Sequence, residues 1–154
     1  MLADIAAGQR LDAERLVQLL ERTGPAVLLT HSAGAPGGWL AADARPDLVV
    51  ALLALEPMGP PFLTVPDGPQ LLPWGLTAAP PAFDPPVADP ADLVPGTHRL
   101  PGLAKVPIGV FSGEASPFDG FAGDIAAFLR DAGCRAEHVR LADRGVRGTP
   151  RPAG

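Results

Sequence analysis

The chain has 154 residues, a hydrophobic fraction of 47% and a formal net charge of −5 at pH 7. This length allows one domain at most, residues 1–154, with enough apolar side chains for a core. An acidic chain without a basic stripe to neutralise phosphates argues against a nucleic-acid partner. No stretch is long and apolar enough to span a bilayer. Because no basic segment leads into an apolar one at the N-terminus, no signal peptide is expected and a cytoplasmic location is favoured.

The first expected elements are a helix and a strand that ends at a serine. Asp12 is a candidate N-cap for a helix that runs to about Arg22, and Gly24 and Pro25 end it. An apolar strand over 26–30 then stops at THSAG, and a helix is expected over 35–44. Strand, tight turn with serine at the tip, and helix form the nucleophile elbow of serine hydrolases.

The elbow predicts a chemical role for Ser32. Such a turn projects the serine Oγ away from the sheet, and the helix behind it offers the Ala33 N–H to a developing oxyanion. Thr30 stands where the usual G-x-S-x-G pattern has its first glycine. The simpler alternative is that Ser32 only caps the following helix.

A second apolar strand is expected over 48–55, directly before Glu56. A continuous apolar run of this length suits a strand buried in a parallel sheet. Glu56 would then lie at the same carboxyl edge as Ser32, where the functional groups of open α/β sheets gather. Glu56 is therefore the expected acid, unless it is merely a solvated residue at a strand end.

Residues 57–105 are rich in proline, and pairs such as Pro60-Pro61 cannot continue a helix or a central strand. This stretch is predicted to be a long, partly ordered insertion rather than a disordered linker, because it contains many large apolar side chains. We expect it to be cap-like and to form a wall of the substrate pocket. The residues expected to line that pocket are Met58, Phe62 and Trp74.

Regular structure is expected to resume with a strand over 106–112, a helix over 118–132 and a short strand over 138–141. The alternation of strands and helices predicts an α/β fold with a parallel sheet of about four strands and flanking helices. Glu114 follows the third strand and is an alternative acid. Cys134 is the single cysteine, which excludes an intramolecular disulfide, and it is expected to pack as a small apolar residue.

Several stretches resemble one known family. GPAVLLTHSAG and GGWLAADARPDLVVALLALEPMGPPF are similar to α/β-hydrolase-fold bacterial esterases whose acid is a glutamate after the sixth strand. PWGLT, FDPPVADPADL and VFSGEAS are further matches, so that the resemblance covers about residues 12–148. It implies hydrolysis of small carboxylic esters through an acyl-enzyme, without a cofactor or a metal, with Ser32 as nucleophile and Glu56 as acid. The separation of these two residues is the one shown by that subgroup.

The same resemblance shows what is missing. Family members have strands before the elbow and a catalytic histidine after the last strand, where this sequence has about Arg151. His31, His98 and His138 are not expected to reach Ser32, because none follows the last strand. We therefore expect a partial, truncated hydrolase domain that is inactive alone. The alternative is a non-catalytic remnant or interaction protein, and in either case the first strand is expected to form an exposed edge that promotes self-association.

Overall fold

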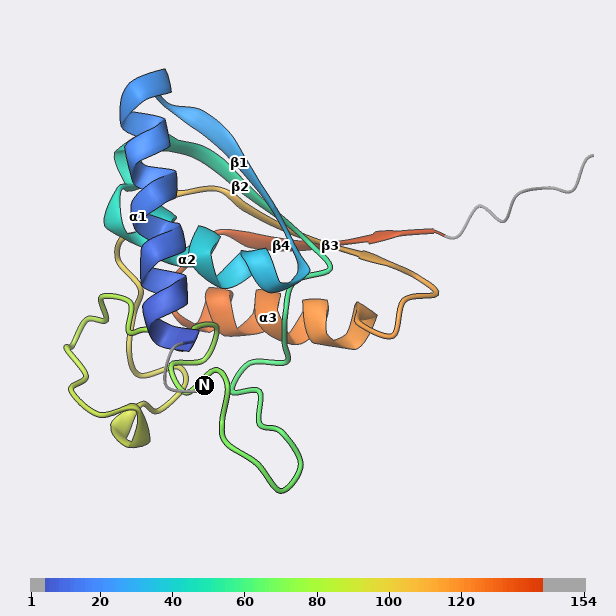
Figure 1. Ribbon diagram of the computed structural model, residues 1–154. Helices are drawn as coiled ribbons and strands as arrows, with labels where there is room; N and C mark the ends of the chain where they lie inside the picture. The colour runs from blue at the N-terminus through green and yellow to red at the C-terminus, as the bar shows by residue number, and fades with distance from the viewer. Residues whose placement is uncertain (1–4, 143–154) are drawn as a thin grey trace, which may run out of the picture.

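The computed structural model describes residues 5–142, and its centre is a four-stranded sheet (Figure 1). The strands are β1 (Ala26–His31), β2 (Val49–Leu55), β3 (Ile108–Gly113) and β4 (Ala136–Leu141). They lie in the order β1-β2-β3-β4, and every neighbouring pair is parallel. The predicted α/β fold with a parallel sheet of four strands is confirmed. Because the strands are parallel, each connection must return from the carboxyl edge of the sheet to its amino edge.

The described part of the chain has three α-helices beside the sheet: α1 (Ile5–Thr23), α2 (Ala35–Ala44) and α3 (Asp119–Asp131). Helix α2 packs on β1 and β2, α3 packs on β3 and β4, and α1 packs on α2 (Figure 1). Residues of β1 alternate accordingly: Thr30 is buried, whereas Val27 and Leu29 are 55% and 59% exposed. Among the residues that the structure describes, helices cover one face of the sheet and leave the opposite, apolar face open.

Helix α1 begins earlier than the sequence predicted, at Ile5 instead of Asp12. Its first two turns are held by the segment that follows β2, because Gln9 Oε1 accepts hydrogen bonds from Ala78 N at 2.7 Å and Ala79 N at 3.4 Å. Gln9 itself is only 8% exposed. A polar residue that is buried by a distant segment leaves no periodic signal, so the sequence pattern missed this part of the helix.

The other boundaries lie close to the predicted ones. Helix α2 has the expected bounds, and β4 begins two residues earlier than predicted. The earlier start follows from pairing, because Ala136 lies opposite Ile108 and is buried. His138 is consequently the third residue of the strand and not its first. The segment around Arg151, where the resemblance would place the catalytic histidine, lies outside the described residues.

The proline-rich segment forms the crossover between β2 and β3. It contains the 3-10 helices Pro90–Asp92 and Leu103–Lys105 and two isolated bridges, Thr64 with Gln70 and Asp84 with Arg99. It supplies a large set of buried side chains: Leu72, Trp74, Leu76, Phe83, Leu93, Leu100 and Leu103. The segment thus covers the helices and takes the place that a crossover helix has in other α/β units.

Along residues 5–142, no helix combines the length and the apolarity that crossing a bilayer requires. Cys134 is buried in the core, as expected, at 6% exposure. Its burial, together with the nearby Asp43 carboxylate, raises the pKa of its thiol to about 11.

Candidate active site

Ser32 lies at the turn between β1 and α2. The strand ends at His31, Ser32–Gly34 form one 3-10 turn, and α2 starts at Ala35. The φ angle of Ser32 is 51°, a left-handed conformation that costs free energy for any residue other than glycine and concentrates at functional sites. The Ser32 carbonyl accepts hydrogen bonds from Ala35 N and, at 3.1 Å, from Met58 N. The turn therefore has the strand–turn–helix form that the sequence predicted.

A glycine on α2 compensates for Thr30 at the first position of the elbow motif. A Cβ atom added to Gly38 would lie 2.5 Å from Thr30 Cγ2, closer than two carbon atoms can approach. Helix α2 packs this closely on β1 only because Gly38 has no side chain. The threonine is accommodated without opening the turn that holds Ser32.

Glu56 lies beside Ser32 at the same edge of the sheet. His31 and Leu55 are partners in the β1–β2 ladder, so the two residues that follow them leave neighbouring strands at the same level. Glu56 also has a left-handed backbone, with φ at 44°. Within the described part of the chain, no hydrogen bond joins the Ser32 and Glu56 side chains.

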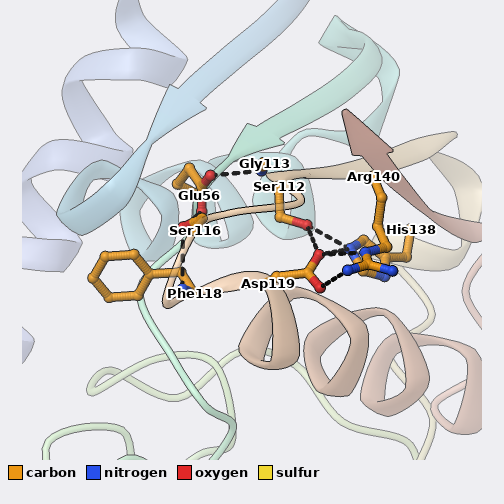
Figure 2. Close-up of polar contacts among 8 residues, drawn as sticks. All are labelled: Glu56, Ser112, Gly113, Ser116, Phe118, Asp119, His138 and Arg140. Carbon is orange, nitrogen blue, oxygen red and sulfur yellow. Dashed lines mark hydrogen bonds and ion pairs between the residues drawn. The ribbon is translucent and has the colours of Figure 1, made fainter. Parts of the chain in front are cut away.

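Figure 2 shows that the Glu56 carboxylate is held from the loop after β3. Oε1 accepts a hydrogen bond from Gly113 N, and Oε2 accepts one from Ser116 Oγ, both at 2.8 Å. The Ser116 oxygen in turn accepts a hydrogen bond from Phe118 N at 3.1 Å. Both carboxylate oxygens of Glu56 thus have a donor.

Glu114, the alternative acid, is placed differently. It is exposed, and its backbone N–H donates to Leu141 O at 2.9 Å. Among the described residues, its carboxylate makes no hydrogen bond or ion pair. The sequence pattern pointed to Glu114 in this loop, whereas the residues that hydrogen-bond to the Glu56 carboxylate are Gly113 and Ser116. Their position directly after β3, on the edge that carries Ser32, was the available signal.

Two of the three histidines contact residues other than Ser32, and the third is exposed. His31 is exposed. The ring of His98 lies 3.0 Å from Pro85 O through Nδ1 and packs edge-on against Phe83. His138 Nε2 lies 2.7 Å from Ser112 Oγ. In the part that the structure describes, none of them hydrogen-bonds to Ser32 or Glu56.

A second polar cluster surrounds Asp119 (Figure 2). Ser112 Oγ donates to Asp119 Oδ1 at 2.7 Å, and Arg140 donates to the same carboxylate through Nε at 3.0 Å and Nη2 at 2.8 Å. The Ser112 hydrogen bond and the Arg140 guanidinium hold the pKa of Asp119 below its usual value. His138 Nε2 lies 3.6 Å from Asp119 Oδ1.

The cluster contains serine, histidine and aspartate, but it lacks the geometry of a catalytic triad. In a triad the histidine lies between the acid and the serine. Here the Ser112 hydroxyl lies between His138 and Asp119, and Ser112 is 1% exposed, so no substrate can reach it. The cluster ties α3 to β3 and β4.

The three residues predicted to line the pocket have different surroundings. Met58 and Phe62 are partly exposed, and Phe62 meets Phe128 edge-on with ring centroids 5.7 Å apart. Trp74 is 8% exposed and stacks on Phe83. Trp74 therefore packs in the core, and Met58 and Phe62 are the more exposed of the three.

The chain is similar in sequence to a fungal lipase. The chain is 34% identical to the probable secreted lipase phiG of a fungal species (strain ATCC 74256), over 150 aligned residues and 84% of the chain. The chain spans 41% of the length of that lipase. No protein-family model matches the chain, and no solved structure matches it. The similarity to a lipase and the parallel sheet agree with an α/β-hydrolase-like fold.

Proposed function

We propose that this chain carries the nucleophile and the acid of a serine hydrolase that acts on carboxylic esters. Ser32 is the proposed nucleophile and Glu56 the proposed acid. The observation that carries the proposal is the left-handed turn at Ser32 next to a glutamate whose two oxygens are both held in place. Similarity to a probable secreted lipase supports the same reaction class.

The proposed reaction forms an acyl-enzyme. Ser32 Oγ attacks the ester carbonyl, and a base oriented by Glu56 takes the serine proton. The Ala33 N–H stabilises the oxyanion, the C–O bond to the alcohol breaks, and water later hydrolyses the acyl-serine. Glu56 is favoured over Glu114 because it lies beside Ser32 and its carboxylate is oriented. Met58, whose N–H contacts the Ser32 carbonyl, and Phe62 are the proposed residues of the substrate pocket.

The base is not among the contacts of Ser32 or Glu56 within residues 5–142. We therefore expect the chain alone to hydrolyse p-nitrophenyl butyrate no faster than its Ser32→Ala variant, because losing one triad member costs orders of magnitude in rate. This expectation also fits the second candidate, a non-catalytic relative that keeps the sheet without the chemistry. An experiment that supplies a base from solution distinguishes the serine hydrolase from the non-catalytic relative.

Free imidazole is such a base. With imidazole and p-nitrophenyl butyrate, we expect mass spectrometry to detect an acyl group that peptide fragmentation localises to Ser32. The matched controls are Ser32→Ala, which removes the nucleophile, and Glu56→Gln, which removes the charge that orients the imidazole. Acylation that is equal in all three proteins would reject the proposed function and favour the non-catalytic relative.

We also propose that copies of this chain associate through the free edge of β1. Within residues 5–142 this strand is the last of the sheet, and two of its side chains, Val27 and Leu29, are more than half exposed. Unpaired apolar edge strands are templates for pairing with another chain.

A further inference from the structure

We infer that the loop Gly113–Phe118 is a preformed receptor for the Glu56 carboxylate and that Ser116 is its positioning residue. Ser116 touches neither the proposed nucleophile nor the substrate, and it acts through Glu56. Its catalytic meaning rests on the proposed function, whereas the hydrogen bonds themselves do not.

The loop supplies one donor to each oxygen of the acid. Gly113 N and Ser116 Oγ lie 2.8 Å from Oε1 and Oε2 respectively, distances typical of charge-assisted hydrogen bonds. Two donors from one loop fix the rotation of the carboxylate plane, which a single donor does not. The orientation of Glu56 is therefore set by the loop.

The direction of the Ser116 hydroxyl is also fixed. Its oxygen accepts the Phe118 N–H at 3.1 Å, and its one hydrogen is then free to be donated to Glu56. At its backbone, Glu56 N donates to Phe111 O at 2.8 Å. Both the backbone and the side chain of Glu56 are thus anchored to the end of β3.

The ends of the loop are held without any contribution from Glu56. Ser112 Oγ donates to Asp119 Oδ1 across the base of the loop at 2.7 Å. Inside the loop, Ser116 N donates to Gly113 O and Asp119 N donates to Ser116 O, at 3.0 and 3.2 Å. A loop that is closed in this way presents its two donors before the carboxylate arrives, which is the preorganisation that a positioned acid needs.

The competing explanation gives Ser116 a local role only. A serine whose oxygen accepts a hydrogen bond from the N–H two residues later forms a common turn, which stabilises the chain ahead of α3. If this were its whole role, removing the hydroxyl would have the same effect whether or not Glu56 is present. A double-mutant cycle separates the two explanations.

The experiment compares Ser116→Ala, Glu56→Ala and the double variant by urea unfolding. We expect Ser116→Ala to lower the ratio of folded to unfolded protein by roughly 5- to 30-fold when Glu56 is present. In the Glu56→Ala background, we expect the same change to lower the ratio at least threefold less. Ser116→Thr keeps the hydroxyl and is the matched control, with an expected loss of less than half that of Ser116→Ala on a logarithmic scale.

Orientation has its own readout in the amide resonance of Gly113, followed by NMR as the pH changes. In the unaltered chain this resonance is expected to respond to the ionisation of the carboxylate that it binds. The response should vanish in Glu56→Ala, fall by half or more in Ser116→Ala, and be kept in Ser116→Thr. If Ser116 had a purely structural role, the response of the Gly113 resonance in Ser116→Ala would keep its full amplitude.

Equal stability losses in both backgrounds, or an undiminished Gly113 response in Ser116→Ala, would overturn the inference. Neither measurement involves an ester. A failed acylation experiment together with a positive cycle would reject the proposed function and keep the carboxylate receptor. Successful acylation of Ser32 without coupling between Ser116 and Glu56 in the cycle would keep the proposed function and reject the carboxylate receptor.

Discussion

The ionisation of Asp119 is expected to affect the stability of the folded chain. Its carboxylate accepts hydrogen bonds from Ser112 and Arg140, and it therefore holds α3, β3 and β4 together. The Ser112 hydrogen bond and then the Arg140 charge lower the pKa of Asp119 in the folded chain. A lowered pKa means that the ionised form is favoured by folding.

The pH dependence of stability follows from this shift. The contribution of Asp119 is fully present above the pKa of an unfolded aspartate, about 3.9, and it is lost as the pH falls through the lower folded value. We expect Asp119→Asn to be less stable than the unaltered chain at pH 7 in urea unfolding. The difference should shrink as the pH falls below about 3.9, because the aspartate of the unfolded chain is then protonated while the folded carboxylate, with its lowered pKa, is still ionised.

Asp124→Asn is the matched control for this prediction. Asp124 is also on α3, but it is exposed and, within the described residues, makes no ion pair. Its substitution should change stability little and leave the acid dependence intact. A constant difference between Asp119→Asn and the unaltered chain from pH 7 to pH 3 would contradict the assigned role.

Among the elements, α2 is the one whose placement depends most on a single residue. Eight of its ten residues are buried, and Gly38 brings it against Thr30 of β1. We expect Gly38→Ala to destabilise the chain by about 1–3 kcal/mol, because the added methyl group overlaps Thr30 Cγ2 and the core cannot expand without loss. Thermal or urea unfolding measures this change.

Two further variants test whether the cause is this contact. Thr30→Ala removes the overlapping methyl group, so the double variant with Gly38→Ala should recover a large part of the loss. Gly8→Ala lies in the interior of α1 with open space around the position, and it should stabilise the chain by about 0.5–1 kcal/mol. A Gly38→Ala variant as stable as the unaltered chain would show that α2 can shift away from β1.

The sequence predicted those elements whose signals are local. The apolar run before Glu56 and the tight turn at Ser32 were enough to predict β2, the elbow and the parallel sheet, because both signals depend on neighbouring residues only. The first turns of α1 were missed, since they depend on Gln9 contacting Ala78, 69 residues away. The same limit applies to Ser116: its position after β3 places it at the edge that carries Ser32, but it does not single out Glu56, 60 residues earlier, as its partner. The burial of Trp74 was not indicated either, since an aromatic residue in a proline-rich segment gives no sign of how deeply it is buried.

At the scale of the whole molecule, the main feature is an apolar sheet face that no part of residues 5–142 covers. The exposed side chains of β1 continue on this face across the ladder, because Val27 lies opposite Ala51 and Leu29 lies opposite Leu53. A hollow of about 670 Å³ follows the same face, lined by Leu53, Phe111 and Val139 among others. A second groove of about 450 Å³ lies beside β1 and α1, with Leu16, Leu19 and Leu29 in its wall.

These surfaces predict that the chain associates in solution. Contiguous apolar surface of this kind marks interaction sites or leads to aggregation, and β1 adds unpaired backbone groups at its edge. We expect size-exclusion chromatography with light scattering to give at least twice the monomer mass of 15.8 kDa. Leu29→Lys should shift the chain towards the monomer, because a charge on the open face and at the free edge opposes both modes of association.

Leu11→Lys provides the matched control. Leu11 is 45% exposed, but it is on α1 and away from the open sheet face, so the same loss of an exposed leucine should leave the mass unchanged. The two variants separate a specific contact of β1 from a general effect of surface hydrophobicity. A monomer that binds no hydrophobic dye would contradict the prediction, because it would require the open face to be covered by a part of the same chain. Equal shifts with Leu29→Lys and Leu11→Lys would instead assign the association to surface hydrophobicity and not to the edge of the sheet.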